Sequence, residues 1–159
     1  NNTVYGNSGV GLYMANEGAV QGYTNNNLIK NNIFSGNTTA ELGVVYTVEN
    51  ETNIFSNNSF GVESDNFIYW GIANPLDTYD AWETAYGGTT ASVEVDPLLN
   101  NPPTDFRLLS ISTLIDGGED VGLIRDRDGN PKSGTAWDIG AYEFQKEKGG
   151  LAPGMGMAP

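Results

Sequence analysis

Asn2-Thr3-Val4-Tyr5-Gly6-Asn7 recurs with changes as Asn32-Ile33-Phe34-Ser35-Gly36-Asn37 and as Asn53-Ile54-Phe55-Ser56-Asn57-Asn58. The shared frame has Asn at its first and sixth positions, an apolar residue at the third, and Gly or Asn at the fifth. The steps from Asn2 to Asn32 and from Asn32 to Asn53 are 30 and 21 residues. A variable step is typical of stacked repeats that carry loops of different length.

Short β-rich runs within these repeats are bounded by Gly and Asn, which tolerate the left-handed backbone conformation at little cost. Such corners let the chain bend between strands without forming a hairpin. Successive turns of the chain then stack in parallel, apolar positions form a shared core, and equivalent Asn side chains stack by hydrogen bonding. The repeats therefore predict an all-β fold in which successive turns of the chain stack in parallel as a solenoid.

Two other structures are compatible with so much Asn and Gly. A disordered, prion-like tract would be rich in Asn, but such tracts are poor in the Val, Ile, Phe and Tyr that recur here. An antiparallel β-sandwich would have shorter repeats and Asn-Gly hairpin turns, which are missing. The parallel arrangement agrees better with the repeat length.

One segment, residues 76–88, has a helical pattern. Asp77 is the expected N-cap, Gly87 the expected stop, and Tyr79, Trp82 and Tyr86 fall on one face. A helix this short needs tertiary packing to be stable, so we expect its aromatic face to lie on the β core.

The composition excludes several classes of function. The 159 residues contain 20 acids and 7 bases, for a net charge of −13, and no Cys or His. Disulfide frameworks, Cys or His nucleophile systems and Ser-His-Asp triads are therefore excluded. The scattered bases do not form the basic patch that nucleic-acid binding needs, and no apolar stretch is long enough to span a membrane.

The second half contains an ordered series of motifs that resembles the C-terminal end of extracellular bacterial and archaeal proteins of the pectate-lyase-like, right-handed parallel β-helix group. The motifs are Asp80-Ala81-Trp82-Glu83-Thr84-Ala85, Ser92-Val93-Glu94-Val95-Asp96-Pro97-Leu98-Leu99, Asp105-Phe106-Arg107-Leu108, Leu114-Ile115-Asp116-Gly117-Gly118, Asp126-Arg127-Asp128-Gly129-Asn130-Pro131 and Asp138-Ile139-Gly140-Ala141-Tyr142-Glu143. The resemblance covers residues 1–145. It implies β-helix turns over 1–75, a helical excursion over 76–88, and a final turn with a closing segment over 89–145. A flexible Gly/Pro tail is expected over 146–159.

This resemblance also implies a secreted or cell-surface location and polysaccharides as partners. We expect a piece of a longer protein, structural or polysaccharide-binding and not catalytic by itself. The rest of the parent chain or a neighbouring subunit would cover its N-terminal edge. One alternative is the C-terminal part of a polysaccharide lyase or glycoside hydrolase with catalytic turns upstream, and another is the subunit of a surface filament or layer.

Lys30 is the candidate catalytic group, because a lyase needs a base and Lys30 is the one basic residue within the repeats. A solvated outward side chain is the competing interpretation. The acids of the repeats, Glu41 among them, would have to converge on one face to support hydrolysis.

Asp126, Asp128 and Asn130 have the spacing of a calcium loop, so Ca²⁺ is the candidate cofactor. The twelfth position of such a loop would be Trp137 rather than Glu, which favours a tight turn instead. Arg107, Arg125 and Arg127 are expected to pair with Asp138 and Glu143, because these charges cluster in the closing segment.

Aromatic residues recur along the repeats, and exposed flat rings could stack on sugars. Tyr46, Tyr69 and Trp70 are the candidates for carbohydrate binding, and Tyr13 and Tyr23 belong to the same series. The competing interpretation is that these side chains point inward and form the core. The pattern alone leaves both open.

Overall fold

A computed structural model describes residues 1–15, 26–45, 52–65, 67–71, 75–87 and 90–146. The strands in these residues are two to five residues long. In chain order the elements are β1 (Thr3–Tyr5), β2 (Val10–Met14), β3 (Leu28–Lys30), β4 (Ile33–Ser35), β5 (Ala40–Val44), β6 (Ile54–Ser56), β7 (Ile68–Trp70), β8 (Pro75–Leu76), α1 (Tyr79–Tyr86), β9 (Leu99–Asn101) and β10 (Asp105–Leu108).

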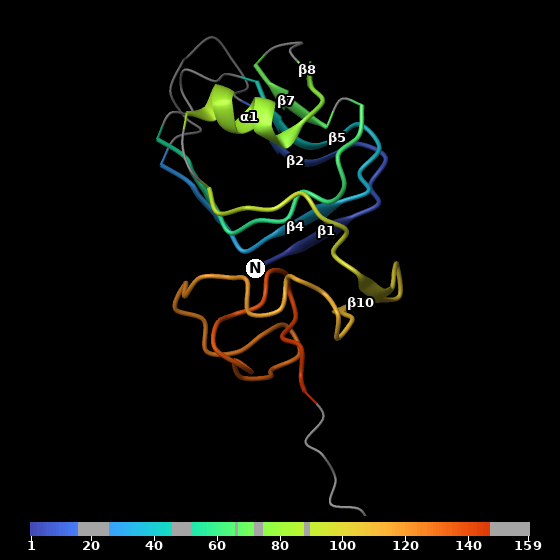
Figure 1. Cartoon of the computed structure of the whole chain (residues 1–159), viewed down its shortest axis with the longest axis vertical. Helices are drawn as coiled ribbons and strands as arrows, with labels where there is room; N and C mark the ends of the chain where they lie inside the picture. Colours follow the sequence, from blue (N-terminus) through green and yellow to red (C-terminus); the bar gives the residue numbers. More distant parts are fainter. Residues whose placement is uncertain (16–25, 46–51, 66, 72–74, 88–89, 147–159) are drawn as a thin grey trace, which may run out of the picture.

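Strands of the first half pair in parallel across long sequence separations. β1 pairs with β4, β3 pairs with β6, and β5 lies between β2 and β7. The register places Val4 beside Phe34, and Leu42 beside Ile68. Apolar side chains at these positions form the core between the strands and α1, in the upper part of Figure 1.

The prediction of a right-handed parallel β-helix is wrong. The described strands form four separate sheets of two to four strands, and two of the strand pairs, β7–β8 and β9–β10, are antiparallel. Strands are short because residues such as Asn31 and Asn57 take positive φ angles of 55° and 51° and end them. Strand β8 pairs antiparallel with β7, although Val93, further along the chain, still forms a parallel bridge with Ser59. The fold is β-rich, with small sheets of mixed strand direction and one short helix.

The predicted 21-residue step from Asn32 to Asn53 is also wrong. Strand β6 pairs with β3, so that Asn53 lies beside Asn27 and Asn58 beside Asn32, at steps of 26 residues. The 30-residue step from Asn2 to Asn32 is the one that the structure contains. The frame Asn53–Asn58 therefore matches the overlapping frame Asn27–Asn32 rather than Asn32–Asn37.

The expected short helix is present as α1, with a different N-cap. Thr78 has extended backbone angles, and its hydroxyl accepts a hydrogen bond from the Ala81 N–H at 3.2 Å, so Asp77 lies one residue too early. Gly87 ends the helix in the left-handed conformation, at φ 76°. Among the residues that the structure describes, no helix has the length and apolar character needed to cross a lipid bilayer.

The aromatic side chains of α1 face the strands. Tyr79 and Trp82 are buried, and Tyr86 packs against the same core. Figure 1 shows the helix lying beside β7 and β8. The helix therefore covers the core, as its aromatic face predicts.

Strand β4 is buried on both faces because it separates two hydrophobic clusters. Phe34 belongs to the core under α1, whereas Ile33 packs with Leu114 and Ile139 of the C-terminal segment. That segment forms the lower part of Figure 1. Gly140 comes so close that a Cβ there would lie 2.7 Å from the Ile33 side chain, and its φ is 117°. A larger residue at this position would separate the C-terminal segment from β4.

Buried carboxylates organise the C-terminal segment by accepting backbone N–H groups. Asp138 is fully buried and accepts from the Asp116 N–H at 2.8 Å and the Phe144 N–H at 2.5 Å. Glu143 accepts from the Asp138 N–H at 2.7 Å and the Ser133 N–H at 3.1 Å. These bonds replace the strand pairing that residues 109–146 lack in the structure.

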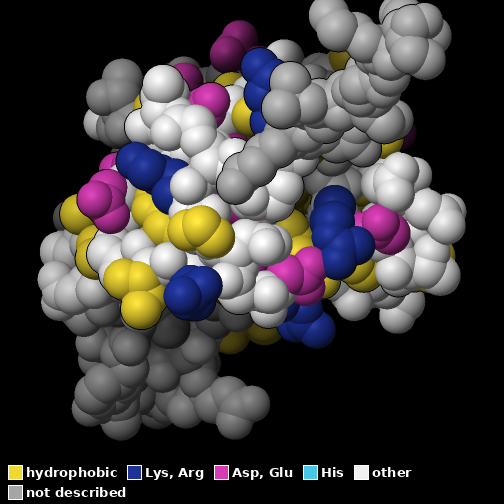
Figure 2. Space-filling model, turned by 90° about the horizontal axis from the view of Figure 1, so that it is seen from below, with side chains coloured by type: hydrophobic (Ala, Val, Ile, Leu, Met, Phe, Trp, Pro, Cys, Tyr) yellow, Lys and Arg dark blue, Asp and Glu magenta, His cyan; other side chains and the backbone are white. Residues whose placement is uncertain are grey.

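The expected ion pairs of these carboxylates with arginines are not formed. The guanidinium of Arg107 instead pairs with Asp105 and Asp128, and Arg125 donates to the Gly129 carbonyl at 2.6 Å. Figure 2 shows basic and acidic side chains interspersed over the lower face of the molecule. Exposed charges pair with one another there, whereas the buried acids bind backbone amides.

The Glu143 side chain gives a pH-dependent prediction. Burial raises the pKa of Glu143 above its ordinary 4.5. As pH falls from 7 towards about 4.5, the folded state takes up this proton before the unfolded state does, so this residue adds stability on acidification. We therefore expect the free energy of unfolding of the natural protein to increase relative to that of Glu143→Gln as the pH falls over this range. Urea denaturation of both proteins at several pH values measures it, and a constant difference would contradict the prediction.

Candidate functional site

Two tyrosines lie on the outer face of the sheet made by β2, β5 and β7. Tyr13 on β2, Gly43 on β5 and Tyr69 on β7 are register partners, so their Cα–Cβ directions point to the same side of the sheet. The neighbouring residues Ile68 and Trp70 point the other way and are buried. Tyr13 is 61% exposed and Tyr69 is half-buried. The sheet therefore presents two aromatic side chains in one line across its strands.

Gly43 shapes the surface between the tyrosines. A Cβ at this position would lie 3.0 Å from Cδ2 of Tyr13 and 3.2 Å from Cγ1 of Val10. The ring of Tyr13 thus leans over Gly43, and a larger residue there would displace it. The Cα atoms of Tyr13 and Tyr69 are separated by two strand spacings, roughly 9–10 Å, because neighbouring strands lie about 4.7–4.9 Å apart.

The three aromatic candidates of the sequence have different positions. Tyr69 lies on this outer face, whereas Trp70 is only 7% exposed and its ring packs against Phe55, Trp82 and Tyr86. Trp70 therefore has no free ring face for a sugar. Tyr46 lies outside the described residues. The sequence includes Tyr13 in the same aromatic series but does not make it a candidate, because its alignment with Tyr69 across Gly43 depends on the strand order.

Lys30, the catalytic candidate, is engaged in an ion pair. Its Nζ lies 2.5 Å from Oε1 of Glu119, and the Ser56 hydroxyl donates to the other carboxylate oxygen at 3.1 Å. The side chains of Lys30 and Glu119 are 25% and 32% exposed. This pair joins β3 to the C-terminal segment, which is a structural role.

Glu41 on β5 is another buried ionisable group, in addition to Asp138 and Glu143. Its carboxylate accepts from the backbone N–H of Asn37 at 3.1 Å and from the side-chain amide of Asn37 at 2.6 Å. Burial raises the pKa of Glu41, and these hydrogen bonds act in the opposite direction. Both carboxylate oxygens thus hold the loop before β5.

The Asp126–Asn130 stretch forms a turn closed by its own side chains. Asp126 accepts from the backbone N–H of Asn130 at 2.7 Å and from its side-chain amide at 3.1 Å. Asp128 is directed towards Arg107 and accepts hydrogen bonds from its guanidinium. Both carboxylate oxygens of Asp126 and Oδ2 of Asp128 are therefore engaged within the protein, and within the described ranges no group of three acidic side chains is placed to hold a metal ion.

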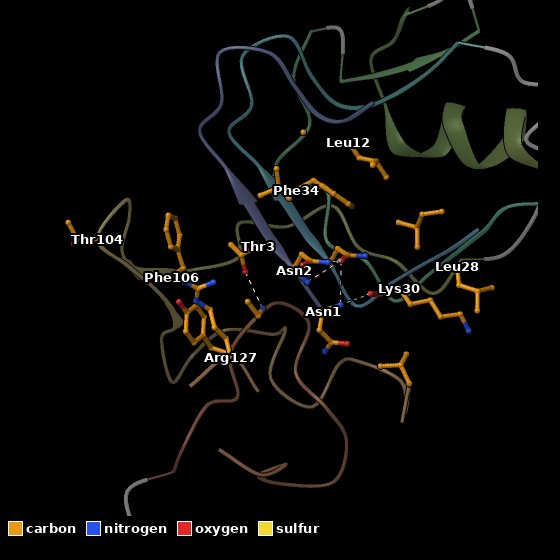
Figure 3. A pocket seen from close by; sticks show the side chains of 17 residues that line it. Asn1, Asn2, Thr3, Leu12, Leu28, Lys30, Phe34, Thr104, Phe106 and Arg127 are labelled. Atoms are coloured by element: carbon orange, nitrogen blue, oxygen red, sulfur yellow. Dashed lines mark hydrogen bonds between the residues drawn. The ribbon is translucent and has the colours of Figure 1, made fainter. Parts of the chain in front are cut away.

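A cleft of about 840 Å³ lies where three sheet edges meet. It is lined by residues of β1, β2 and β3, among them Val4, Leu12 and Ile29, and by Phe106 and Arg127 of the C-terminal half. Figure 3 shows Phe106 and Arg127 at one end of this cleft and Leu28 and Lys30 at the other. Each of β1, β2 and β3 is the terminal strand of its sheet. The cleft therefore combines strand edges with the open end of the hydrophobic core.

Comparisons with protein-family models, with curated proteins and with solved structures gave no match. Together with the small separate sheets, this result overturns the resemblance to the pectate-lyase-like β-helix group that the C-terminal motifs indicated.

Proposed function

We propose that this chain is a non-catalytic polysaccharide-binding module, and that sugar rings stack on the outer face of the β2–β5–β7 sheet. The observation that carries the proposal is the in-register line of Tyr13, Gly43 and Tyr69. The strands hold the Cα atoms of the two tyrosines about two strand spacings apart. The missing side chain of Gly43 leaves room for the Tyr13 ring to lie over it, on the side of Tyr69.

The charge of the chain favours a neutral polysaccharide over an acidic one. The net charge of −13 would repel a polyuronate, and this repulsion weakens only when salt screens it. Stacking of a neutral sugar on tyrosine does not involve this cost. Cellulose, chitin, xylan and mannan are wall or matrix polymers, so binding to one of them would place the module outside the cell or on its surface.

Removal of the two tyrosines tests this function. We expect Tyr13→Ala and Tyr69→Ala each to weaken binding to an insoluble neutral polysaccharide at least tenfold, or ~1.4 kcal/mol, and the double variant to lose retention. Depletion binding assays on cellulose, chitin, xylan and mannan measure the affinity. Circular dichroism verifies that each variant is folded.

Two matched controls separate stacking from general loss of apolar surface. Tyr5→Ala removes a partly exposed tyrosine on β1, outside this face, and Ile124→Ala removes a side chain that is 82% exposed. Both controls should bind as the natural protein does. Unchanged binding by the double tyrosine variant, or equal retention on pectate and alginate, would disprove the proposed function.

A further inference from the structure

Asparagine side chains join neighbouring parallel strands in the same way at four places. These Asn residues flank the strands. In each pair, the Oδ1 atom of one Asn accepts hydrogen bonds from both the backbone N–H and the side-chain amide of the Asn beside it in the neighbouring turn of the chain. The donor–acceptor pairs, with backbone and side-chain distances, are Asn2–Asn32 (3.0 and 2.9 Å), Asn7–Asn37 (3.1 and 2.8 Å), Asn27–Asn53 (2.8 and 2.9 Å) and Asn32–Asn58 (3.0 and 2.9 Å).

Two of these four Asn pairs end at the edge of β1. Asn2 and Asn7 flank this strand, are exposed, and donate to Asn32 and Asn37. Within the part of the chain that the structure describes, the Oδ1 atoms of Asn2 and Asn7 accept no hydrogen bond. With the geometry of the four pairs, each of these two Oδ1 atoms can accept hydrogen bonds from one further Asn beside an added strand.

The backbone of β1 presents matching groups. The Asn2 carbonyl accepts from the Ile33 N–H at 2.8 Å, and the Gly6 N–H donates to the Ser35 carbonyl at 3.1 Å, so the even-numbered residues face β4. Because alternate residues of a parallel strand direct their peptide groups to opposite sides, Thr3 and Tyr5 direct theirs away from β4. No described strand pairs with these groups, so they form a strand edge of the kind that adds an extended peptide.

The lining of the cleft beside this edge is apolar. Val4 and Leu12 are partly buried and pack on the main core, and Phe34 of the adjacent strand lies beneath them. Figure 3 shows Leu12 and Phe34 along one side of the cleft and Asn2 at its centre. In three of the four pairs, the residues two positions after each Asn are apolar and belong to this core: Val4 with Phe34, Ile29 with Phe55, and Phe34 with Phe60. In the Asn7–Asn37 pair the corresponding residues are Gly9 and Thr39.

We propose that the β1 edge binds an extended segment of a partner polypeptide with the frame Asn-x-apolar-x-x-Asn, added in parallel to β1. The two Asn side chains of the segment donate to Asn2 and Asn7, and its apolar side chain covers Val4. A second copy of this chain is a poorer occupant, because two copies carrying −13 each repel one another. This inference uses a different face from the tyrosine surface and is independent of the proposed function.

Binding of a synthetic peptide tests the inference. A fluorescein-labelled 12-residue peptide with one Asn-x-Val-x-x-Asn frame is titrated with the full chain, and fluorescence anisotropy gives the affinity. A control peptide has Asp in place of both Asn residues. This change keeps the size of the two side chains but removes their amide N–H donors. We expect at least tenfold weaker binding of the control peptide.

Variants of the protein locate the site. Asn2→Ala combined with Asn7→Ala should weaken peptide binding at least tenfold, and Val4→Asp should abolish it. Asn100→Ala, an exposed Asn on β9, should have no effect. Equal affinity for the two peptides, or unchanged binding by the double variant, would overturn the proposal. Self-association in light scattering that the double variant abolishes would also overturn it, because a second copy would then occupy the edge.

Discussion

Trp82→Ala is expected to lower the free energy of unfolding by about 3–5 kcal/mol, the usual cost of removing a buried tryptophan. Trp82 is fully buried at the centre of the aromatic cluster between α1 and the strands. Its ring centroid lies 5.2–5.5 Å from four other rings and 6.1 Å from a fifth; the five rings are those of Phe60, Tyr79, Tyr86, Phe55 and Trp70. Alanine would leave a cavity that these rings cannot all move to fill.

Trp82→Phe provides a graded comparison. The indole Nε1 of Trp82 is buried and has no hydrogen-bond partner among the described residues. Phenylalanine removes this unsatisfied donor and keeps much of the ring contact, so we expect a loss of only about 1–2 kcal/mol. Ile124→Ala, at an exposed position, should change stability by less than about 0.5 kcal/mol.

Urea denaturation followed by circular dichroism measures these differences. A loss below 1 kcal/mol for Trp82→Ala would show that α1 is detached from the strands in solution. If Trp82→Phe were as unstable as Trp82→Ala, indole-specific contacts rather than cavity size would determine the stability. Either result would contradict the packing described here.

Local features of the sequence predicted local structure well. The positions of Tyr79, Trp82 and Tyr86 specify one helix face, and Gly87 specifies the end, because spacing and glycine chemistry act within a few residues. The N-cap was misplaced by one residue, because Asp77 and Thr78 are both suitable caps and only the backbone angles distinguish them.

Features that depend on strand order were not predictable in the same way. The frame Asn53–Asn58 fits both Asn27–Asn32 and Asn32–Asn37, which share Asn32, and the choice is made by packing across the molecule. The alignment of Tyr13 and Tyr69 on either side of Gly43 also depends on the strand order. The antiparallel pairing of β8 with β7 is likewise a tertiary property, so the number of stacked strands could not be read from the repeats.

The ion-pair predictions were wrong for a different reason. They considered only side-chain partners, whereas Asp138 and Glu143 bind backbone N–H groups. Every residue except proline carries such a donor, so residue types in a sequence do not show where a carboxylate will find one. The buried carboxylates of the C-terminal segment therefore became visible only in the structure.

Asp138→Ala is expected to lower the free energy of unfolding by about 2–4 kcal/mol. The substitution removes two charge-assisted hydrogen bonds, each worth ~1.5–3 kcal/mol, and leaves the amides of Asp116 and Phe144 without their acceptor. Burial raises the pKa of Asp138 above its ordinary 3.8, which shows that the buried charge itself has a cost and makes the net loss smaller than the sum of the two bonds.

The exposed Asp120 provides the matched control for this substitution. Its carboxylate also accepts a backbone N–H, that of Gly122 at 2.8 Å, but water can replace the carboxylate there. Asp120→Ala should therefore cost less than about 1 kcal/mol. Hydrogen exchange of the Asp116 and Phe144 amides gives a second readout, because both should lose protection in Asp138→Ala and keep it in Asp120→Ala. Equal stability losses, with both amides still protected, would mean that hydrophobic packing around Leu114 and Ile139 holds the segment without the carboxylate.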